Sequence, residues 1–516
     1  MELLKLNFFK KLMKSDSEQE NQFPEQTSEN EILIKKKHID RSLANNLNTI
    51  KSLYSIPLNS DIKIRQFTYG EMQIKAMVVY ISTITDAQKI DESIIQPLLT
   101  SQSSKGVDNI ITAETISTVK VIEDTVKGIN GGNTVLFVDG EECAYIISTS
   151  KFEGRSVEKA GNEVVIKGSK DAFNEMATSN ISLLRKRIKN ESLIVESTIV
   201  SKRSNNEVYL LYVKDLANED IINDVRQRIS SIDVDAIQNA AVLEQYIEER
   251  QKSILPTVLY TERPDRTASF LENGFIVLIM DNSPEALIVP ATFWSFFHNA
   301  EDHYLRFIFG NFIRALRLLA LFITLFISAI YISITNYHVE MVPADLLLAI
   351  SATREIVPFP AIVEILLMEI AFELIREAGL RVPSPIGPTI GIVGALILGQ
   401  AAVQANIVSP LVVIIVALGG LSSFAIGDIS MNFSMRLLRF LFIFSAALFG
   451  FYGMTALFTI GIVYMVSMKS FGVPYLAPMT PTYISSKDTV FRRMLKNEIF
   501  RPGYLKPKDI EKKSGE

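Results

Sequence analysis

The residues of this sequence most able to do chemistry are charged side chains in an otherwise apolar segment, residues 345–379. They include Arg354, Glu355, Glu364, Glu369 and Glu373. A charge that faces lipid costs about 2.5–3.5 kcal/mol on insertion scales, so these groups must face water, a partner or each other. Carboxylates that line a water-filled passage favour cations, so Glu364, Glu369 and Glu373 are candidate pore residues. Arg354 and Glu355 lie beside a proline break and form a candidate gate.

The same charges also suit a purely structural arrangement. Residues 358–360 (PFP) split the segment into two helical pieces, because proline breaks a helix. On the second piece, Glu369, Glu373 and Arg376 share one side at 100° per residue, whereas Glu364 points roughly the opposite way. The first three can form an intrahelical ion-pair network on an amphipathic helix at the membrane surface. The sequence alone leaves both interpretations open.

The sequence contains no recognisable catalytic pattern. There is no Walker P-loop, no dinucleotide-binding glycine motif in a strand–helix context, and no Ser-His-Asp or Cys-His signature. The four histidines lack metal-ligand spacing, and Cys143 is the only cysteine, which excludes an intrachain disulfide. We therefore expect a non-enzyme with no catalytic residues, cofactor or metal site, and no nucleic-acid partner.

Long apolar runs in the last 200 residues are the elements that must position these charges. They are residues 315–335, 386–407, 411–426 and 440–468. A helix needs about 20 apolar residues to cross a bilayer core. The fourth run is too long for one crossing, and Gly450 and Gly453 near its middle predict two helices joined by a tight turn.

Basic residues set the expected orientation of these spans. Arg306, Arg314 and Arg317 lie before or at the start of the first run, Arg436 and Arg439 precede the fourth, and the C-terminal tail is rich in Lys and Arg. The positive-inside rule assigns all of these to the cytoplasm, together with the N-terminal half. The number of crossings must then be even. Six satisfy this requirement. If the charged helix lies flat, four or five crossings remain, and five would not satisfy the even count.

The second run carries a helix-packing pattern. Gly387, Gly391, Ala395 and Gly399 recur every four residues and form one smooth ridge. Small residues at this spacing let helix backbones approach closely. The ridge predicts association with another helix, within or between subunits.

The polar half contains an internal duplication. Three pairs of segments resemble each other at a separation of roughly 130–140 residues, as expected for repeated structural units. The pairs are 77–86 with 209–218, 135–139 with 277–281, and 144–147 with 286–289. In the second pair, an apolar strand ends in Asp followed by Gly or Asn, which is typical of a hairpin turn.

These patterns predict a multidomain chain: an N-terminal cytosolic α/β region of two related subdomains, followed by a polytopic α-helical membrane domain. The expected divisions are a disordered basic and polar tail (1–34), soluble subdomains (35–168 and 169–290), a membrane domain of four to six spans (291–485) and a basic cytosolic tail (486–516).

Two charged clusters in the polar half are expected to be structural. Residues 261–266 (TERPDR) place opposite charges beside a proline and predict a salt-bridged loop. The basic cluster at residues 185–189 is expected to lie on a solvated helix face.

The sequence resembles the A subunit of the GerA-type nutrient germinant receptors of bacterial endospores. The resemblance runs from about residue 42 to 481. Its most specific stretches are 261–266 (TERPDR), 287–294 (LIVPATFW), 352–360 (ATREIVPFP), 394–402 (GALILGQAA) and 470–478 (SFGVPYLAP). One loop departs from the family pattern: residues 427–432 (GDISMN) stand where relatives commonly carry a proline-containing turn.

The resemblance implies a multi-pass receptor subunit in the inner spore membrane, with its soluble half and C-terminal tail facing the core. Implied partners are a transporter-like B subunit that binds the nutrient and a lipoprotein C subunit, besides membrane lipid. The A subunit is implied to oligomerise into a nutrient-gated cation channel. Two alternatives are a non-conducting scaffold that transmits the signal, and a downstream homologue that amplifies germination.

Overall fold

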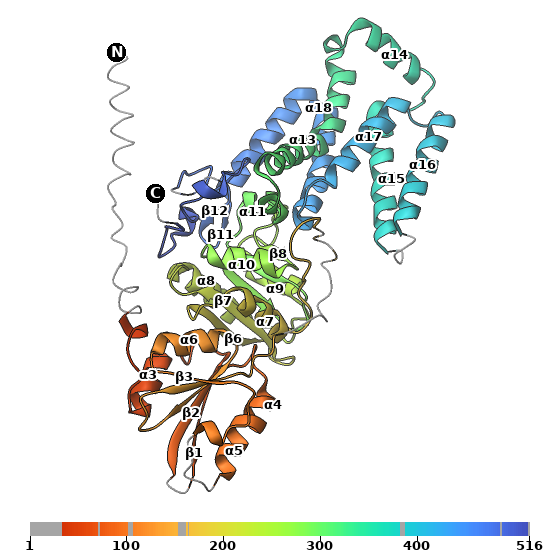
Figure 1. Ribbon diagram of the computed structural model, residues 1–516. Coiled ribbons are helices and arrows are strands. Elements are labelled where there is room, and N and C mark those ends of the chain that lie inside the picture. The colour runs from red at the N-terminus through yellow and green to blue at the C-terminus, as the bar shows by residue number, and fades with distance from the viewer. Residues whose placement is uncertain are drawn as a thin grey trace, which may run out of the picture. The chain divides into compact units, whose positions relative to one another are not determined.

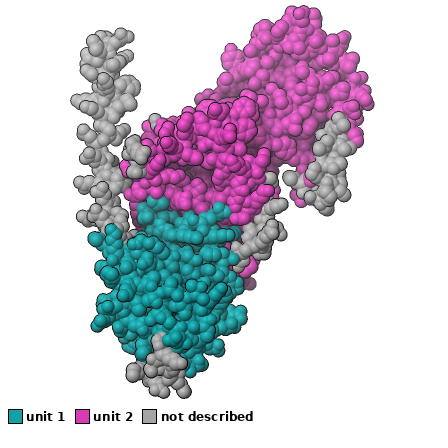
Figure 2. Space-filling view, viewed as in Figure 1, with its two compact units in different colours: residues 1–153, 181–196, 213–217 teal, residues 154–180, 197–212, 218–516 magenta. Residues whose placement is uncertain are grey.

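The structure is a computed structural model that describes most of the chain. The described residues are 33–70, 73–101, 107–152, 161, 163, 165–381, 387–483, 485 and 488–513, without the side chains of 380, 387–393, 395 and 396. Nearly all of the predicted N-terminal tail (1–34) lies outside them. The chain divides into two compact units, coloured separately in Figure 2. Unit 1 comprises residues 1–153, 181–196 and 213–217, and unit 2 comprises the rest.

The first sheet is antiparallel, with five strands in the order β1-β2-β4-β5-β3. The strands are β1 (Ile62–Tyr69), β2 (Ile74–Ile81), β3 (Ile116–Val119), β4 (Thr134–Val138) and β5 (Ala144–Ile147). The accompanying helices are α3 (Leu43–Leu53), α4 (Ala87–Ile90), α5 (Gln96–Thr100) and α6 (Ile122–Asn130). A π-helical turn (Asp91–Ile95) connects α4 to α5, and a 3-10 turn (Val107–Asn109) follows α5.

Helices cover both faces of this sheet (Figure 1). Met77 and Val79 of β2 pack with α3 and α6 in one core. Ala76 and Val78 pack with α4 and α5 in the other core. Because successive strand residues point to opposite faces, a strand buried on both sides must be apolar throughout. This explains the continuous apolar run that identified β2 in the sequence.

The second sheet has five strands in the order β6-β7-β9-β10-β8. The strands are β6 (Leu193–Val200), β7 (Asn206–Val213), β8 (Leu259–Thr261), β9 (Ile276–Met280) and β10 (Ala286–Val289). The helices of this region are α7 (Ala177–Arg187), α8 (Glu219–Ser230), α9 (Ala240–Ile247) and α10 (Pro264–Glu272). The N-terminal region is therefore an α/β region built on two antiparallel sheets.

The two sheets share one strand order, which fits the predicted duplication. The similar segments of the sequence occupy matching positions: β2 with β7, β4 with β9, and β5 with β10. Each copy also uses the same local chemistry. The Asp139 carboxylate accepts the Leu43 N–H at 3.0 Å, and the Asp281 carboxylate accepts the Ala177 N–H at 2.9 Å. In both copies the aspartate that ends a central strand thus binds the first turn of a helix.

The predicted hairpin turns are present in both copies. Strands β4 and β5 pair antiparallel, as do β9 and β10. The residue after the aspartate has a positive φ in each case, 91° at Gly140 and 64° at Asn282. Glycine and asparagine are the residues that adopt this backbone conformation most readily.

A buried ion pair connects residues 181–196 to an earlier part of unit 1. Arg185 donates to both carboxylate oxygens of Asp61, at 2.9 and 2.8 Å, and to Asn59 Oδ1 at 3.3 Å. The Arg185 and Asp61 side chains are only 2% and 4% exposed. The expectation of a solvated face is therefore wrong for Arg185, although Lys186 is exposed. Helical periodicity identified the basic cluster, but its first member turns toward Asp61.

The C-terminal part of unit 2 is mainly helical. Its helices are α11 (Phe293–Phe297), α12 (Glu301–Tyr304), α13 (Phe307–Tyr337), α14 (Ala344–Arg354), α15 (Ala361–Arg381), α16 (Gly387–Gln404), α17 (Pro410–Ser423) and α18 (Ile429–Ser467). The two-stranded sheet β11 (Lys469–Ser470) and β12 (Val473–Pro474) follows. Short 3-10 turns lie at Val339–Met341, Leu495–Asn497 and Gly503–Leu505.

Two helices in the described part of the chain, α13 and α18, are long and apolar enough to cross a membrane. They contain the first and fourth predicted runs. Helix α17, which contains most of the third, is apolar but shorter. Within the helical region, α13 packs against α15, α17 and α18, and α15 packs against α16 and α17.

A glycine interrupts α18 where the sequence predicts a turn. Gly450 has φ 58° and ψ −143°, so two helical halves meet there. A Cβ at this position would lie 3.0 Å from Tyr337 Cγ. The Tyr337 hydroxyl donates to the carbonyls of Ala447 and Leu448, at 2.6 and 2.9 Å. The last residue of α13 thereby binds carbonyl groups that the break leaves without helical partners.

Candidate functional site

The predicted pore carboxylate Glu369 lies in a fully buried ion pair. Its Oε2 is 2.8 Å from Arg439 Nη2 of α18, with side-chain exposures of 0% and 1%. The Ser328 hydroxyl of α13 donates to Oε1 at 2.8 Å. The contact connects α13, α15 and α18. Because a buried carboxylate is stable only with such partners, this pair holds the three helices together.

Glu373, one helical turn further along α15, is shared by three arginines. Arg436 pairs with it directly, Arg439 Nη2 lies 3.0 Å from Oε1, and Arg376 Nη1 lies 3.8 Å from Oε1. Arg376 also donates to the Gly420 carbonyl and the Ser423 hydroxyl of α17, at 3.3 and 3.0 Å. Glu369 and Glu373 therefore belong to a charge network that is mostly interhelical. The intrahelical contact with Arg376 is only one part of it.

Glu364 lies on the other side of α15, as its helical phase predicts. Its Oε2 accepts the Ser409 N–H at 2.9 Å, and its side chain is fully buried. Arg354 Nε is 3.7 Å from Glu364 Oε1, so this candidate gate residue is close to a candidate pore residue. The other candidate gate residue, Glu355, is exposed. The structure thus separates the five predicted residues into an Arg354–Glu364 pair, a Glu369–Glu373 network and an exposed Glu355.

The arginines that complete the Glu369–Glu373 network were missed as site residues. The sequence analysis used Arg436 and Arg439 only as markers of the cytoplasmic side, but the Arg439 side chain is 1% exposed. Their spacing of three residues was a usable signal, because it puts both on one helix face. Nothing in the sequence indicated that this face would contact α15.

The predicted packing ridge lies on α16, largely outside the described side chains. The structure does not describe what packs against Gly387, Gly391 and Ala395. Gly399 is buried, and a Cβ there would lie 3.5 Å from Val413 Cγ1 of α17. Gly399 therefore lies close to α17, and the ridge as a whole stays a prediction.

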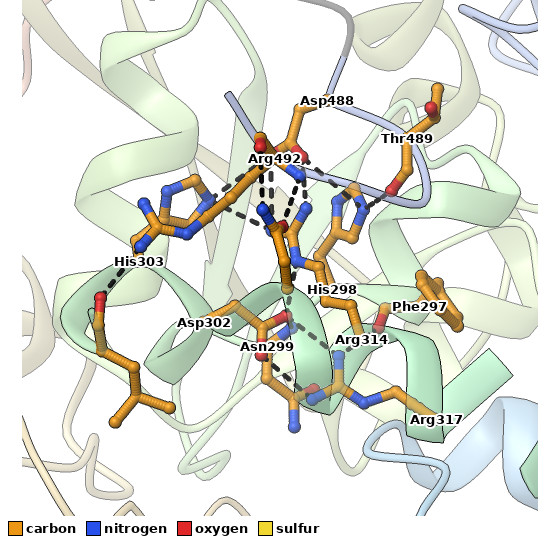
Figure 3. Close-up of polar contacts among 12 residues, drawn as sticks. Phe297, His298, Asn299, Asp302, His303, Arg314, Arg317, Asp488, Thr489 and Arg492 are labelled. Carbon is orange, nitrogen blue, oxygen red and sulfur yellow. Dashed lines mark hydrogen bonds and ion pairs between the residues drawn. The ribbon is translucent and has the colours of Figure 1, made fainter. Parts of the chain in front are cut away.

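A second charge cluster surrounds Asp302, just before α13 (Figure 3). Arg317 donates to both Asp302 carboxylate oxygens, at 2.9 and 3.1 Å, and Arg314 Nε donates to Oδ2 at 3.1 Å. Burial raises the pKa of Asp302, but the two guanidinium groups outweigh burial and hold it below its ordinary value. The cluster fixes the start of α13 to α12.

The C-terminal segment joins this cluster through Asp488. Asp488 pairs with Arg314 and lies 3.4 Å from His303 Nε2 (Figure 3). His298 Nε2 contacts the Thr489 carbonyl, and Arg492 donates to the Leu305 carbonyl at 2.8 Å. The segment predicted as a basic tail, residues 486–516, is therefore bound to α11–α13 at its beginning. Among the described residues, no group of three or more His, Cys, Asp or Glu is placed to hold a metal.

His298 makes the stability of this region depend on pH. Burial lowers its pKa from 6.5 to about 4, more than Asp488 raises it. Between these pH values the unfolded chain binds a proton that folded His298 does not, so acidification favours unfolding. We expect the thermal unfolding midpoint to fall as pH decreases from 6.5 to 4, and to fall less in His298→Gln. The exposed His38 provides the control, and His38→Gln should keep the full pH dependence. An identical pH profile in His298→Gln and the unmodified protein would refute this assignment.

Comparisons with known proteins identify the family. Residues 48–504 match the model for "Bacillus/Clostridium GerA spore germination protein". The chain is 41% identical to "Spore germination protein KA" of Bacillus subtilis (strain 168), over 88% of this chain and 85% of that protein. It is 36% identical to "Spore germination protein A1" of the same organism, over 84% and 89%. It is 34% identical to "Spore germination protein GerLA" of Bacillus cereus, over 87% and 93%.

A crystal structure is also similar. It contains the N-terminal domain of the A subunit of the Bacillus megaterium spore germinant receptor GerK3, with 27% identity and a TM-score of 0.38, over 50% of this chain and 98% of that chain. Because the family model and the three relatives all span most of the chain, the assignment rests on them. This chain belongs to the GerA family of spore germination proteins, as a germinant-receptor A-type subunit.

Proposed function

We propose that this chain is the membrane subunit of a nutrient germinant receptor, and that several copies form a nutrient-gated cation channel in the inner spore membrane. The curated relatives named above are spore germination proteins, which supports the process. Helices α13 and α18 have the length and composition of membrane spans. With the two halves of α18 counted separately and α15–α17 included, the region holds six crossings, or four or five if α15 lies flat. The soluble half and the C-terminal tail then face the spore core.

The observation that carries the channel proposal is the surface of α14. All eleven residues of this helix are described, and none is buried. Leu346 and Leu348 are 53% and 70% exposed. Apolar side chains left uncovered in one protomer are suited to lipid or to neighbouring copies. A ring of copies around α14 would cover them and enclose a central passage.

One face of α14, continued by its C-cap Glu355, carries small and acidic residues that suit the lining of such a passage. Asp345, Ala349, Ala352 and Glu355 fall within an arc of about 120° at 100° per residue. Small and acidic side chains on one stripe leave room for hydrated cations and attract them. In this proposal Glu355 is a gate residue, and its exposed side chain is available to face the passage. Glu364, Glu369 and Glu373 contribute to gating in this proposal, since movement of α15 must break or shift their ion pairs.

The receptor partners in this proposal are a transporter-like B subunit and a lipoprotein C subunit. Nutrient binding to the B subunit would shift α15 against α18, and this shift would break or rearrange the Glu369–Arg439 ion pair between them. This gives the buried charges a role that does not require them to contact the permeating ion.

A non-conducting scaffold is the second candidate, and one observation favours it. The three predicted pore carboxylates all have cationic or backbone partners inside one protomer. A membrane subunit whose charges are internally satisfied can dock partner subunits and relay a signal without a pore.

Ion flux separates the two candidates. Liposomes with the reconstituted three-subunit receptor should release rubidium on nutrient addition, and Glu355→Gln should reduce the flux severalfold, because it removes one gate charge per copy. Glu377→Gln is the matched control, since Glu377 is exposed and pairs with Arg381 at the far end of α15. Equal flux from Glu355→Gln and Glu377→Gln vesicles would remove Glu355 from the passage. Flux no greater than that of empty vesicles would favour the scaffold.

A further inference from the structure

A cavity of about 410 Å³ lies within unit 2, where residues 299–301 meet the ends of α15, α17 and α18. Four arginines line it: Arg263, Arg266, Arg376 and Arg436. Two carboxylates, Glu163 and Glu301, also line it. The lining therefore carries two more positive than negative charges, and guanidinium groups enter it from both the α/β region and the helical region.

Arg263 and Arg266 each pair with a carboxylate, that of Asp265 and of Glu163 respectively, whereas Arg376 and Arg436 have, among the residues that the structure describes, no carboxylate of their own. Arg376 and Arg436 share the single carboxylate of Glu373 with Arg439, so one negative charge serves three guanidinium groups. Arg439 has one further carboxylate, Glu369. The three arginines of the helical region thus share two carboxylates, and of these five groups only Arg376 and Arg436 line the cavity.

A buried donor at the cavity wall also lacks a partner. The Arg263 side chain is 2% exposed and pairs with Asp265 at 2.7 Å. Its Nη2 also donates to the Ser169 carbonyl at 3.0 Å. Its Nε has no hydrogen-bond partner within the described part of the chain. An unpartnered guanidinium N–H costs free energy unless a ligand or water accepts it.

Two aromatic side chains give the cavity an apolar margin. Phe424 and Phe433 line it and are 68% and 53% exposed. The Arg376 guanidinium lies 4.7 Å from the centre of the Phe424 ring, and that of Arg436 lies 5.3 Å from the Phe433 ring. Arginine beside exposed aromatic rings at the ends of apolar helices is the chemistry of a lipid headgroup site.

We infer that this cavity binds a phosphate-type anion. Arginine presents paired N–H donors that match two phosphate oxygens, and the four arginines of the lining supply several such donors. The phosphate can belong to an anionic phospholipid or be free in solution. The lipid source rests on the proposal that α13 and α18 cross a membrane, whereas the free-phosphate source does not depend on it.

The test adds a negative charge to the cavity at a position that tolerates it. Ile429 lines the cavity and is the first residue of α18, where helix N-termini favour acidic side chains. Ser430 is the next residue and does not line it, so Ser430→Glu is the matched control for Ile429→Glu. Val165 also lines the cavity but lies in a loop. Val165→Glu therefore adds the same charge without changing α18, so a loss of affinity in this variant cannot come from misfolding of that helix.

The measurement uses the purified full-length protein in neutral detergent. Unfolding midpoints are followed during titration with phosphatidylglycerol, phosphatidylcholine or inorganic phosphate. We expect the unmodified protein and Ser430→Glu to bind phosphatidylglycerol at least about tenfold more tightly than phosphatidylcholine, and Ile429→Glu and Val165→Glu to lose about tenfold of this affinity.

Each outcome decides the inference. If phosphatidylglycerol stabilises the protein, and Ile429→Glu and Val165→Glu both weaken this effect, the site binds a lipid headgroup. Stabilisation by inorganic phosphate with the same variant pattern, and none specific to phosphatidylglycerol, assigns it to a soluble anion. No anion-specific stabilisation, or equal effects of Ile429→Glu and Ser430→Glu, would overturn the site. A failure of membrane insertion would leave the inorganic phosphate result unchanged.

Discussion

Arg439→Gln is expected to destabilise the folded protein by about 3–5 kcal/mol, the usual effect of removing one partner of a buried ion pair. The change leaves Glu369 as a buried carboxylate without its cation. Of the described residues that donate to Glu369, the Ser328 hydroxyl would remain. Glu373 would lose one of its three arginines as well. Unfolding of the purified full-length protein in detergent measures the loss.

A matched surface pair controls for the loss of a guanidinium on an apolar helix. Arg381 pairs with Glu377 on α15, and their side chains are 79% and 56% exposed. Arg381→Gln should cost less than about 1 kcal/mol. The double variant Glu369→Gln/Arg439→Gln should recover part of the loss, because it leaves no unpaired buried charge. Equal losses for Arg439→Gln and Arg381→Gln would mean that burial adds nothing to the pair.

Arg185→Ala is expected to produce a loss of similar size, about 3–5 kcal/mol, in unit 1. It leaves the Asp61 carboxylate buried without the guanidinium that binds both of its oxygens. Asn59 loses a donor as well. Because Arg185 ties residues 181–196 to unit 1, amide hydrogen exchange in that segment should accelerate together with the loss of stability.

The neighbouring residue supplies the control for Arg185. Lys186 has the same charge, lies on the same helix and is exposed. Lys186→Ala should change the free energy of unfolding by less than about 0.5 kcal/mol. Amide hydrogen exchange in residues 181–196 should stay unaltered. Faster exchange in Lys186→Ala than in Arg185→Ala would contradict the buried pair as the connection.

The duplicated α/β region was largely predictable because its signals are local. A strand such as β2, covered by helices on both faces, must be apolar throughout. The Asp-Gly and Asp-Asn pairs after β4 and β9 are set by backbone conformation at Gly140 and Asn282. Such constraints act within a few residues, so they recur whenever the same unit is repeated.

The break in α18 was predictable for the same reason. Its apolar run exceeds one crossing, and Gly450 adopts a positive φ that other residues rarely adopt. The sequence did not indicate that Tyr337, more than 100 positions earlier, would bind the carbonyls at the break. A side chain that arrives from another helix leaves no periodic signal.

The charge network was only half predictable. Helical phase correctly placed Glu369 and Glu373 on one side of α15 and Glu364 on the other. It gave no information on which helix faces each side, so the pairing with Arg436 and Arg439 was missed. Those two arginines looked like the flank of a span because the positive-inside rule counts charges and does not consider their partners.

Gating by the proposed channel is tested most directly by single-channel recording from the assembled receptor in a planar bilayer. Unitary currents that begin on nutrient addition and carry potassium in preference to chloride are the predicted result. A complex that binds nutrient, remains assembled and passes no unitary current would contradict it, and the chain would then be a membrane-anchored scaffold.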